Sequence, residues 1–146
     1  VCILRAGHPG IGDAMTLECY KNAHHVALVG EGHAQKKFEE MIRKSGITRR
    51  IAFRSQHFMN IPFIVRDTDL VATVPKVIAV TFAHLPGLRA VWPPFEIPRI
   101  PIKQYWHQKR GREPAQVWLR KTVSELFQNR DPTADFPIPL DPIRPA

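Results

Sequence analysis

The chain has 146 residues, of which 44% are apolar and 23% charged, and it carries a formal net charge of +8 at pH 7. This composition is typical of a globular domain and excludes disordered and fibrous chains. The two cysteines, Cys2 and Cys19, show no paired spacing, which argues against a disulfide framework and against a cysteine-based zinc site. No apolar run approaches the ~20 residues of a membrane span, and Arg5 interrupts the apolar start of the chain, so we expect neither a signal peptide nor a membrane partner.

Strand-like and helix-like segments alternate as far as Trp92. Strands are predicted over residues 1–5, 25–29, 50–54, 70–74 and 88–92. Between them, helices are predicted up to Tyr20 with Asp13 or Thr16 as cap, from Ala34 to a stop at Gly46, over 61–64 with Asn60 as cap, and over 75–83. This order predicts an α/β domain with a mainly parallel, twisted sheet flanked by helices. Because the chain starts with Val1 inside a strand-like run, we expect a piece of a longer protein.

The remaining third of the chain has a different pattern. Prolines make an extended connector after Trp92, and residues 100–107 are predicted to form one further strand. Pro114 starts a longer predicted helix. Its apolar stripe consists of Ala115, Trp118, Leu119, Val123, Leu126 and Phe127. Five prolines in residues 129–146 predict a disordered tail.

Motifs for enzymatic chemistry are incomplete. Gly30 and Gly32 follow a predicted strand, but Gln35 stands where a dinucleotide fingerprint needs its third glycine. His24 and His25 are adjacent and point to opposite faces of a strand, and no metal-ligand spacing of histidines occurs. The sequence contains no nucleophile elbow. We therefore expect no metal, no cofactor and no enzyme.

The basic charge gathers in two segments. Residues 99–121 contain seven basic side chains against one acid, Glu113, and residues 36–54 contain a second group. Glu39 and Glu40 precede Arg43 and Lys44 by four residues, a spacing typical of solvent-exposed helix pairs. A solvated surface and contact with nucleic acid both remain possible interpretations.

Open parallel sheets bind ligands beyond the carboxyl ends of their strands. The predicted ends are Arg5 to His8, Arg54 to Phe58, and Thr73 to Pro75. The middle end offers Ser55, His57 and Phe58 just before a helix whose amides could receive an anion. His57 and Phe58 could equally seal the edge of the core.

Three stretches then suggest a family. Arg5-Ala6-Gly7-His8-Pro9, His57-Phe58 with Ile61-Pro62, and the run Asp69 to Pro75 resemble the effector-binding domain of LysR-type transcriptional regulators. Tyr105-Trp106-His107, Pro114 and Trp118-Leu119-Arg120 extend the resemblance to about residue 128. It is similar to the branch of nodulation and aromatic-degradation regulators.

The resemblance implies a fold like that of periplasmic binding proteins, in which an effector binds between two lobes. Residues 1–98 would form the second lobe, and residues 99–128 the returning strand and final helix of an incomplete first lobe. The implied effector-binding residues are Arg5, Ser55, His57, Phe58 and Tyr105. His8 would either cap the hinge turn or line the cleft.

The function implied is that of a cytoplasmic transcription regulator that senses a small effector, forms a homo-oligomer and contacts promoter DNA only through a missing N-terminal domain. The effector would be a small aromatic compound or a carboxylate. A transport-type solute-binding domain of the same architecture is the alternative, and the N-terminus of the full-length protein separates the two.

Overall fold

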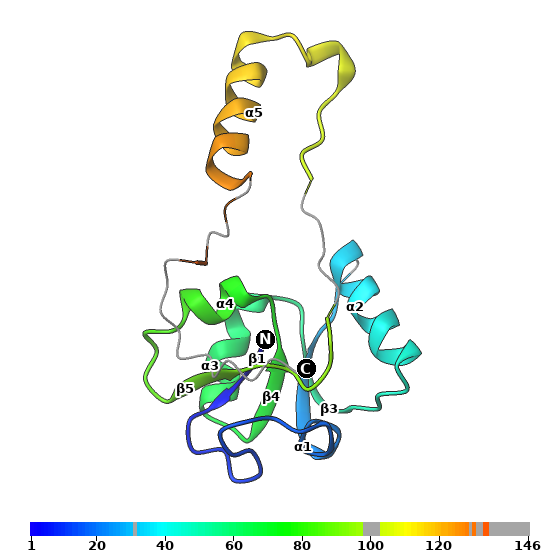
Figure 1. The fold of residues 1–146 in the computed structure, drawn as a ribbon, viewed down its shortest axis with the longest axis vertical. Coiled ribbons are helices and arrows are strands. Elements are labelled where there is room, and N and C mark those ends of the chain that lie inside the picture. The colour runs from blue at the N-terminus through cyan, green and yellow to red at the C-terminus, as the bar shows by residue number, and fades with distance from the viewer. Residues whose placement is uncertain (31, 98–102, 129, 131–132, 135–146) are drawn as a thin grey trace. The chain divides into compact units, whose positions relative to one another are not determined.

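The computed structural model of the chain describes residues 1–30, 32–97, 103–128, 130, 133 and 134. The described residues form two compact units: residues 1–97 belong to the first, and residues 103–134, with the gaps just given, belong to the second (Figure 1). The predicted tail over residues 129–146 lies almost entirely outside the described residues, as do residues 98–102.

The first unit contains the predicted alternation of strands and helices. Its strands are β1 (Cys2–Arg5), β2 (His24–Leu28), β3 (Arg50–Ser55), β4 (Leu70–Thr73) and β5 (Leu88–Val91). Its helices are α1 (Leu17–Asn22), α2 (His33–Lys44), α3 (Ile61–Arg66) and α4 (Lys76–Thr81), and a 3₁₀ turn, η1 (Phe58–Asn60), precedes α3. The prediction of an α/β domain is confirmed.

The five strands form one sheet in the order β3-β2-β4-β1-β5. β2 pairs in parallel with β3 and β4, whereas β1 pairs antiparallel with β4 and β5. Four strands therefore share one direction and β1 alone runs against them. The prediction of a mainly parallel sheet is confirmed, but the reversed direction of β1 changes which loops share an edge.

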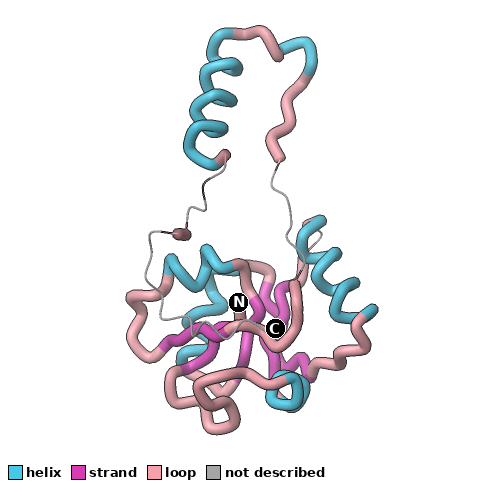
Figure 2. Tube along the Cα trace, in the orientation of Figure 1, coloured by secondary structure: helices cyan, strands magenta, loops and turns pink. Residues whose placement is uncertain are grey.

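Helices cover both faces of the sheet, so the unit has three layers (Figure 2). Successive residues of β1 point to opposite faces, with Ile3 packed toward α3 and Cys2 and Leu4 packed toward α1 and α2. The core facing α3 and α4 contains Val1, Ile3, Val26, Ile61, Val65, Ala72, Val74, Ala79 and Ala90. The core facing α1 and α2 contains Cys2, Leu4, Ile11, Met15, Tyr20, Ile42, Ile47, Val71 and Val91.

Local signals account for the helix ends. The Thr16 hydroxyl accepts a hydrogen bond from the Cys19 N–H at 3.1 Å and caps α1, which settles the choice between Asp13 and Thr16. Gly46 ends α2 with a positive φ of 64°, a conformation that favours glycine. Asn60 makes no capping bond with its side chain, because the preceding 3₁₀ turn already continues into α3.

The second unit contains a 3₁₀ turn, η2 (Gln108–Arg110), and the predicted helix, α5 (Pro114–Phe127). Residues 103–107, the described part of the predicted strand 100–107, form no strand, so that prediction is wrong for these residues. A strand needs a neighbour to pair with, and the described part of this unit contains none. The side chains of Trp118, Leu119, Leu126 and Phe127 on α5 are exposed.

Candidate functional site

The carboxyl ends of the parallel strands define the candidate site. β2, β3 and β4 end together at Leu28, Ser55 and Thr73, and β1 begins at this same edge. The chain leaves β2 toward α2 on one face of the sheet, but leaves β3 and β4 toward α3 and α4 on the other. Such a reversal opens the crevice in which α/β sheets bind ligands. We call this edge the carboxyl edge.

The structure brings three of the predicted site residues together at the carboxyl edge. Ser55 is buried, and its hydroxyl donates to the His57 carbonyl at 2.9 Å and accepts from the His57 N–H at 3.2 Å. His57 is exposed, and Phe58 is half-buried against the core that faces α3. Phe58 thus packs against the core and keeps part of its surface exposed, while His57 is open to solvent.

Arg5 does not join these residues. Because β1 is antiparallel to its neighbours, Arg5 lies opposite Leu88, the first residue of β5, at the other edge of the sheet. The prediction that the end of β1 shares an edge with the end of β3 is wrong, since a strand-like pattern does not define the direction of the strand. Arg5 instead forms an ion pair there, with its Nε atom 2.5 Å from Asp69 Oδ1.

His8 closes the turn that follows β1. Its Nδ1 atom accepts a hydrogen bond from the Gly10 N–H at 3.1 Å, and its Nε2 atom lies 3.0 Å from the Asp69 carbonyl oxygen. Since Nδ1 is an acceptor, Nε2 carries the proton and donates to Asp69. Of the two alternatives, the structure supports the capping role.

Tyr105 lies in the second unit and is 86% exposed. Its neighbour Trp106 makes a cation–π contact: the Arg120 guanidinium carbon lies 4.6 Å from the Trp106 ring centroid. Arg120 also donates to the Gly111 carbonyl at 2.6 Å. This contact anchors the segment before α5 and leaves the Tyr105 ring free for contact.

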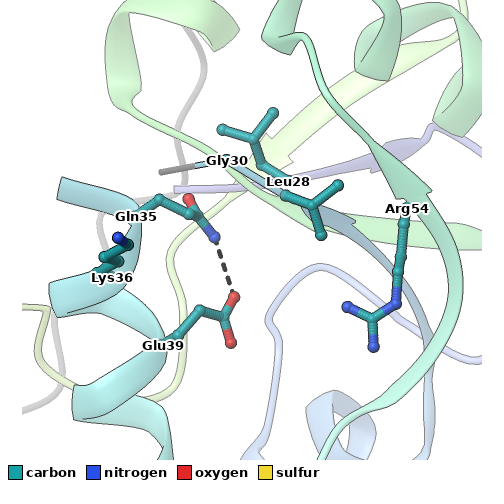
Figure 3. A pocket seen from close by; sticks show the side chains of 7 residues that line it. Leu28, Gly30, Gln35, Lys36, Glu39 and Arg54 are labelled. Carbon is teal, nitrogen blue, oxygen red and sulfur yellow. Dashed lines mark hydrogen bonds between the residues drawn. The ribbon is translucent and has the colours of Figure 1, made fainter. Parts of the chain in front are cut away.

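A shallow hollow of about 330 Å³ lies on the α2 side of the carboxyl edge (Figure 3). Its lining consists of Leu28, Val29, Gly30, Gln35, Lys36, Glu39 and Arg54. Arg54 begins one of the predicted strand ends, whereas nothing in the sequence predicts a site at Gln35 or Glu39, because the α2 charges have the spacing of solvated pairs. Glu40 does pair with Lys44, at 2.9 Å, but Glu39 pairs with Arg49, at 2.5 Å, and accepts from Gln35 at 3.0 Å. The sequence signal that points to this hollow is its position directly after the carboxyl end of β2.

A buried polar cluster joins α1 to the sheet through Tyr20, His25 and Thr73. Burial lowers the pKa of His25 to about 4, although its Nε2 atom lies 2.7 Å from the Tyr20 carbonyl oxygen. Burial also raises the pKa of Tyr20 to about 12, and the Tyr20 hydroxyl lies 3.0 Å from Thr73 Oγ1. The pKa of the buried Cys2 thiol is raised for the same reason. These groups remain uncharged at neutral pH, which is typical of a structural role.

Within the part of the chain that the structure describes, no group of three or more His, Cys, Asp or Glu side chains could hold a metal ion. No helix there has the length and apolar character needed to cross a membrane.

Comparison with known proteins identifies the family. The family model described as LysR substrate binding domain matches residues 1–128 of this chain. The transcriptional activators NagR of Ralstonia sp. and NahR of Pseudomonas putida are 35% and 33% identical to the chain over 127 residues, which is 87% of this chain and 42% of either relative. The regulatory domain of MexT, a transcriptional activator in Pseudomonas aeruginosa, matches with a TM-score of 0.63 and 28% identity over 85% of this chain and 60% of that one.

The chain thus spans less than half the length of these curated relatives, which are transcription regulators and not enzymes. The matched regulatory domain shares the fold that the sequence resemblance implied. The chain belongs to the LysR substrate-binding domain family.

Proposed function

We propose that this chain is the ligand-sensing part of a bacterial transcription regulator, and that a small effector binds at the carboxyl edge. The observation that carries this proposal is that Ser55, His57 and Phe58 lie together at the carboxyl edge of a LysR substrate-binding domain. Arg5 is left out of the proposed site because it lies at the opposite edge and is paired with Asp69.

The proposed effector is a small aromatic compound or a carboxylate. The exposed His57 ring can donate a hydrogen bond to an anionic or polar group, and Phe58 lies next to it with a half-buried aromatic ring. Tyr105, which is exposed in the second unit, stays a prediction from the family resemblance. No chemical step is needed for this function, since binding energy alone can shift an equilibrium between conformations.

The proposed mechanism is differential binding. An effector that prefers one arrangement of the regulator stabilises that arrangement in proportion to its difference in affinity. In the intact cytoplasmic protein, a homo-oligomer, this shift would reposition N-terminal DNA-binding domains on the promoter. The basic side chains of this chain would then be solvated surface and would not read DNA sequence.

A thermal-shift titration of the intact protein with benzoate and other aromatic carboxylates tests the proposal. A compound that binds only the folded state raises the melting temperature as its concentration increases. Glucose and lysine serve as neutral and cationic controls. The proposal fails if no anionic or aromatic compound shifts the melting temperature, or if only the controls do.

A further inference from the structure

We propose that Ser55 is a positioning residue: its buried hydroxyl fixes the backbone of His57, so that the His57 ring, and not the Ser55 hydroxyl, contacts the effector. This inference rests on the proposed function and assigns separate roles to two residues of the same site. It differs from the expectation based on the sequence, in which both side chains contact the effector.

The hydrogen-bond inventory of Ser55 is nearly complete without a ligand. A serine hydroxyl has one proton to donate and two lone pairs to accept with. The proton goes to the His57 carbonyl at 2.9 Å, and one lone pair accepts the His57 N–H at 3.2 Å. Only 6% of Ser55 is exposed, so a ligand could reach little of it.

The backbone on both sides of this turn is anchored. The Ser55 carbonyl accepts a hydrogen bond from the Val29 N–H at 2.7 Å, which ties the end of β3 to the segment after β2. On the other side, Phe58 packs against the core. His57 has an extended backbone between them, with φ −130° and ψ 133°, and its side chain is exposed.

Removal of the hydroxyl would therefore act through His57. Both of the bonds that the Ser55 side chain makes end on the His57 backbone, so their loss frees the residue that carries the exposed ring. A less ordered ring must be fixed when the effector binds, and this lowers affinity without any lost contact to the effector.

A double-mutant cycle in the intact protein, with benzoate as the probe, tests the assignment. We compare wild type, Ser55→Ala, His57→Ala and the double variant, and add Ser55→Thr, which keeps the hydroxyl. If Ser55 acts through His57, Ser55→Ala weakens benzoate binding in the wild-type background but changes it less than twofold when His57 is already Ala. Equal losses in both backgrounds would show that Ser55 contacts benzoate directly and would overturn the assignment.

Amide hydrogen exchange gives a second readout that needs no ligand. We expect exchange at the His57 N–H to rise on the order of tenfold in Ser55→Ala and to return toward the wild-type rate in Ser55→Thr. An unchanged exchange rate in Ser55→Ala would overturn the positioning role. If benzoate does not bind wild type at all, the proposed effector class is contradicted, whereas the exchange rates still decide the role of Ser55.

Discussion

Arg5 Nε lies 2.5 Å from Asp69 Oδ1 and thereby joins the end of β1 to the turn before β4, at the edge of the sheet opposite His57. This pair holds Arg5, which the family resemblance implies to be an effector-binding residue, at the edge away from Ser55, His57 and Phe58. Its side chains are 34% and 60% exposed, which makes it a surface ion pair.

Replacement of Arg5 by Gln is expected to affect stability slightly and effector response not at all. Surface ion pairs contribute about 0.2–1 kcal/mol, and salt weakens them. Urea unfolding at low and high salt measures the stability, and an effector titration of the intact protein measures the response. A large loss of response with normal stability would return Arg5 to the effector site.

Acid is expected to destabilise the first unit through His25. Burial holds the folded-state pKa of His25 near 4, below the ordinary value of 6.5, so the unfolded chain binds a proton that the folded unit excludes. This contribution to stability is therefore complete above pH 6.5 and is lost as the pH falls from there toward 4. The total is on the order of 3 kcal/mol.

His25→Gln is the matched variant for this prediction, because glutamine can donate to the Tyr20 carbonyl but does not titrate between pH 4 and 7. Denaturant unfolding over that range should show a steeper pH dependence for wild type than for the variant. Equal slopes would mean that the acid sensitivity has another origin.

Gly111→Ala is expected to displace Trp106. A Cβ atom at Gly111 would lie 3.2 Å from the Gln108 carbonyl oxygen and 3.3 Å from Trp106 Nε1, closer than most such contacts. The stacking of Arg120 on the Trp106 ring would weaken, at a cost of about 0.5–1 kcal/mol. The Trp106 indole N–H signal in NMR spectra should shift, while Gly12→Ala should leave it in place, because no atom beyond the adjacent residues lies within 4 Å of a Cβ at Gly12. An unmoved signal in Gly111→Ala would contradict this packing.

The exposed stripe of α5 is expected to cause self-association of this chain. Trp118 and Leu126 are 66% and 52% exposed, and burial of such side chains contributes roughly 1.5–3 kcal/mol each. Contiguous exposed apolar surface of this kind recruits a partner. Light scattering should give at least twice the monomer mass for this chain, and the monomer mass for a chain that ends at Pro98. Monomers in both cases would contradict the expectation.

The elements of the first unit follow from sequence because their signals are local. β-rich runs bounded by Gly and Pro, and the i, i+4, i+7 spacing in α2, locate each strand and helix to within a few residues. Strand direction is not local: no residue of Cys2–Arg5 indicates that β1 runs antiparallel to β4, so the sequence pattern alone does not predict the edge at which Arg5 lies.

In the candidate site, too, the order of residues follows from the sequence, but the hydrogen bonds between them do not. Sequence order alone brings Ser55, His57 and Phe58 together, since they follow one strand. The hydroxyl of Ser55 could be read only as a possible ligand contact, because its two bonds to the His57 backbone depend on the conformation of the turn. Residues 103–107 have a strand-like pattern but no strand beside them in the described part of their unit.

The most direct test of the account is an effector titration of the intact protein carrying His57→Ala, with His84→Ala as control. His84 is also exposed but lies between α4 and β5, at the opposite edge of the sheet from His57. Loss of one hydrogen bond to a neutral effector costs about 0.5–1.5 kcal/mol, and to a charged one up to ~3 kcal/mol. We predict that His57→Ala weakens effector binding about 2- to 10-fold or more with an unchanged melting temperature of the free protein, and that His84→Ala binds like wild type. A lower melting temperature with unchanged effector binding in His57→Ala would contradict the account.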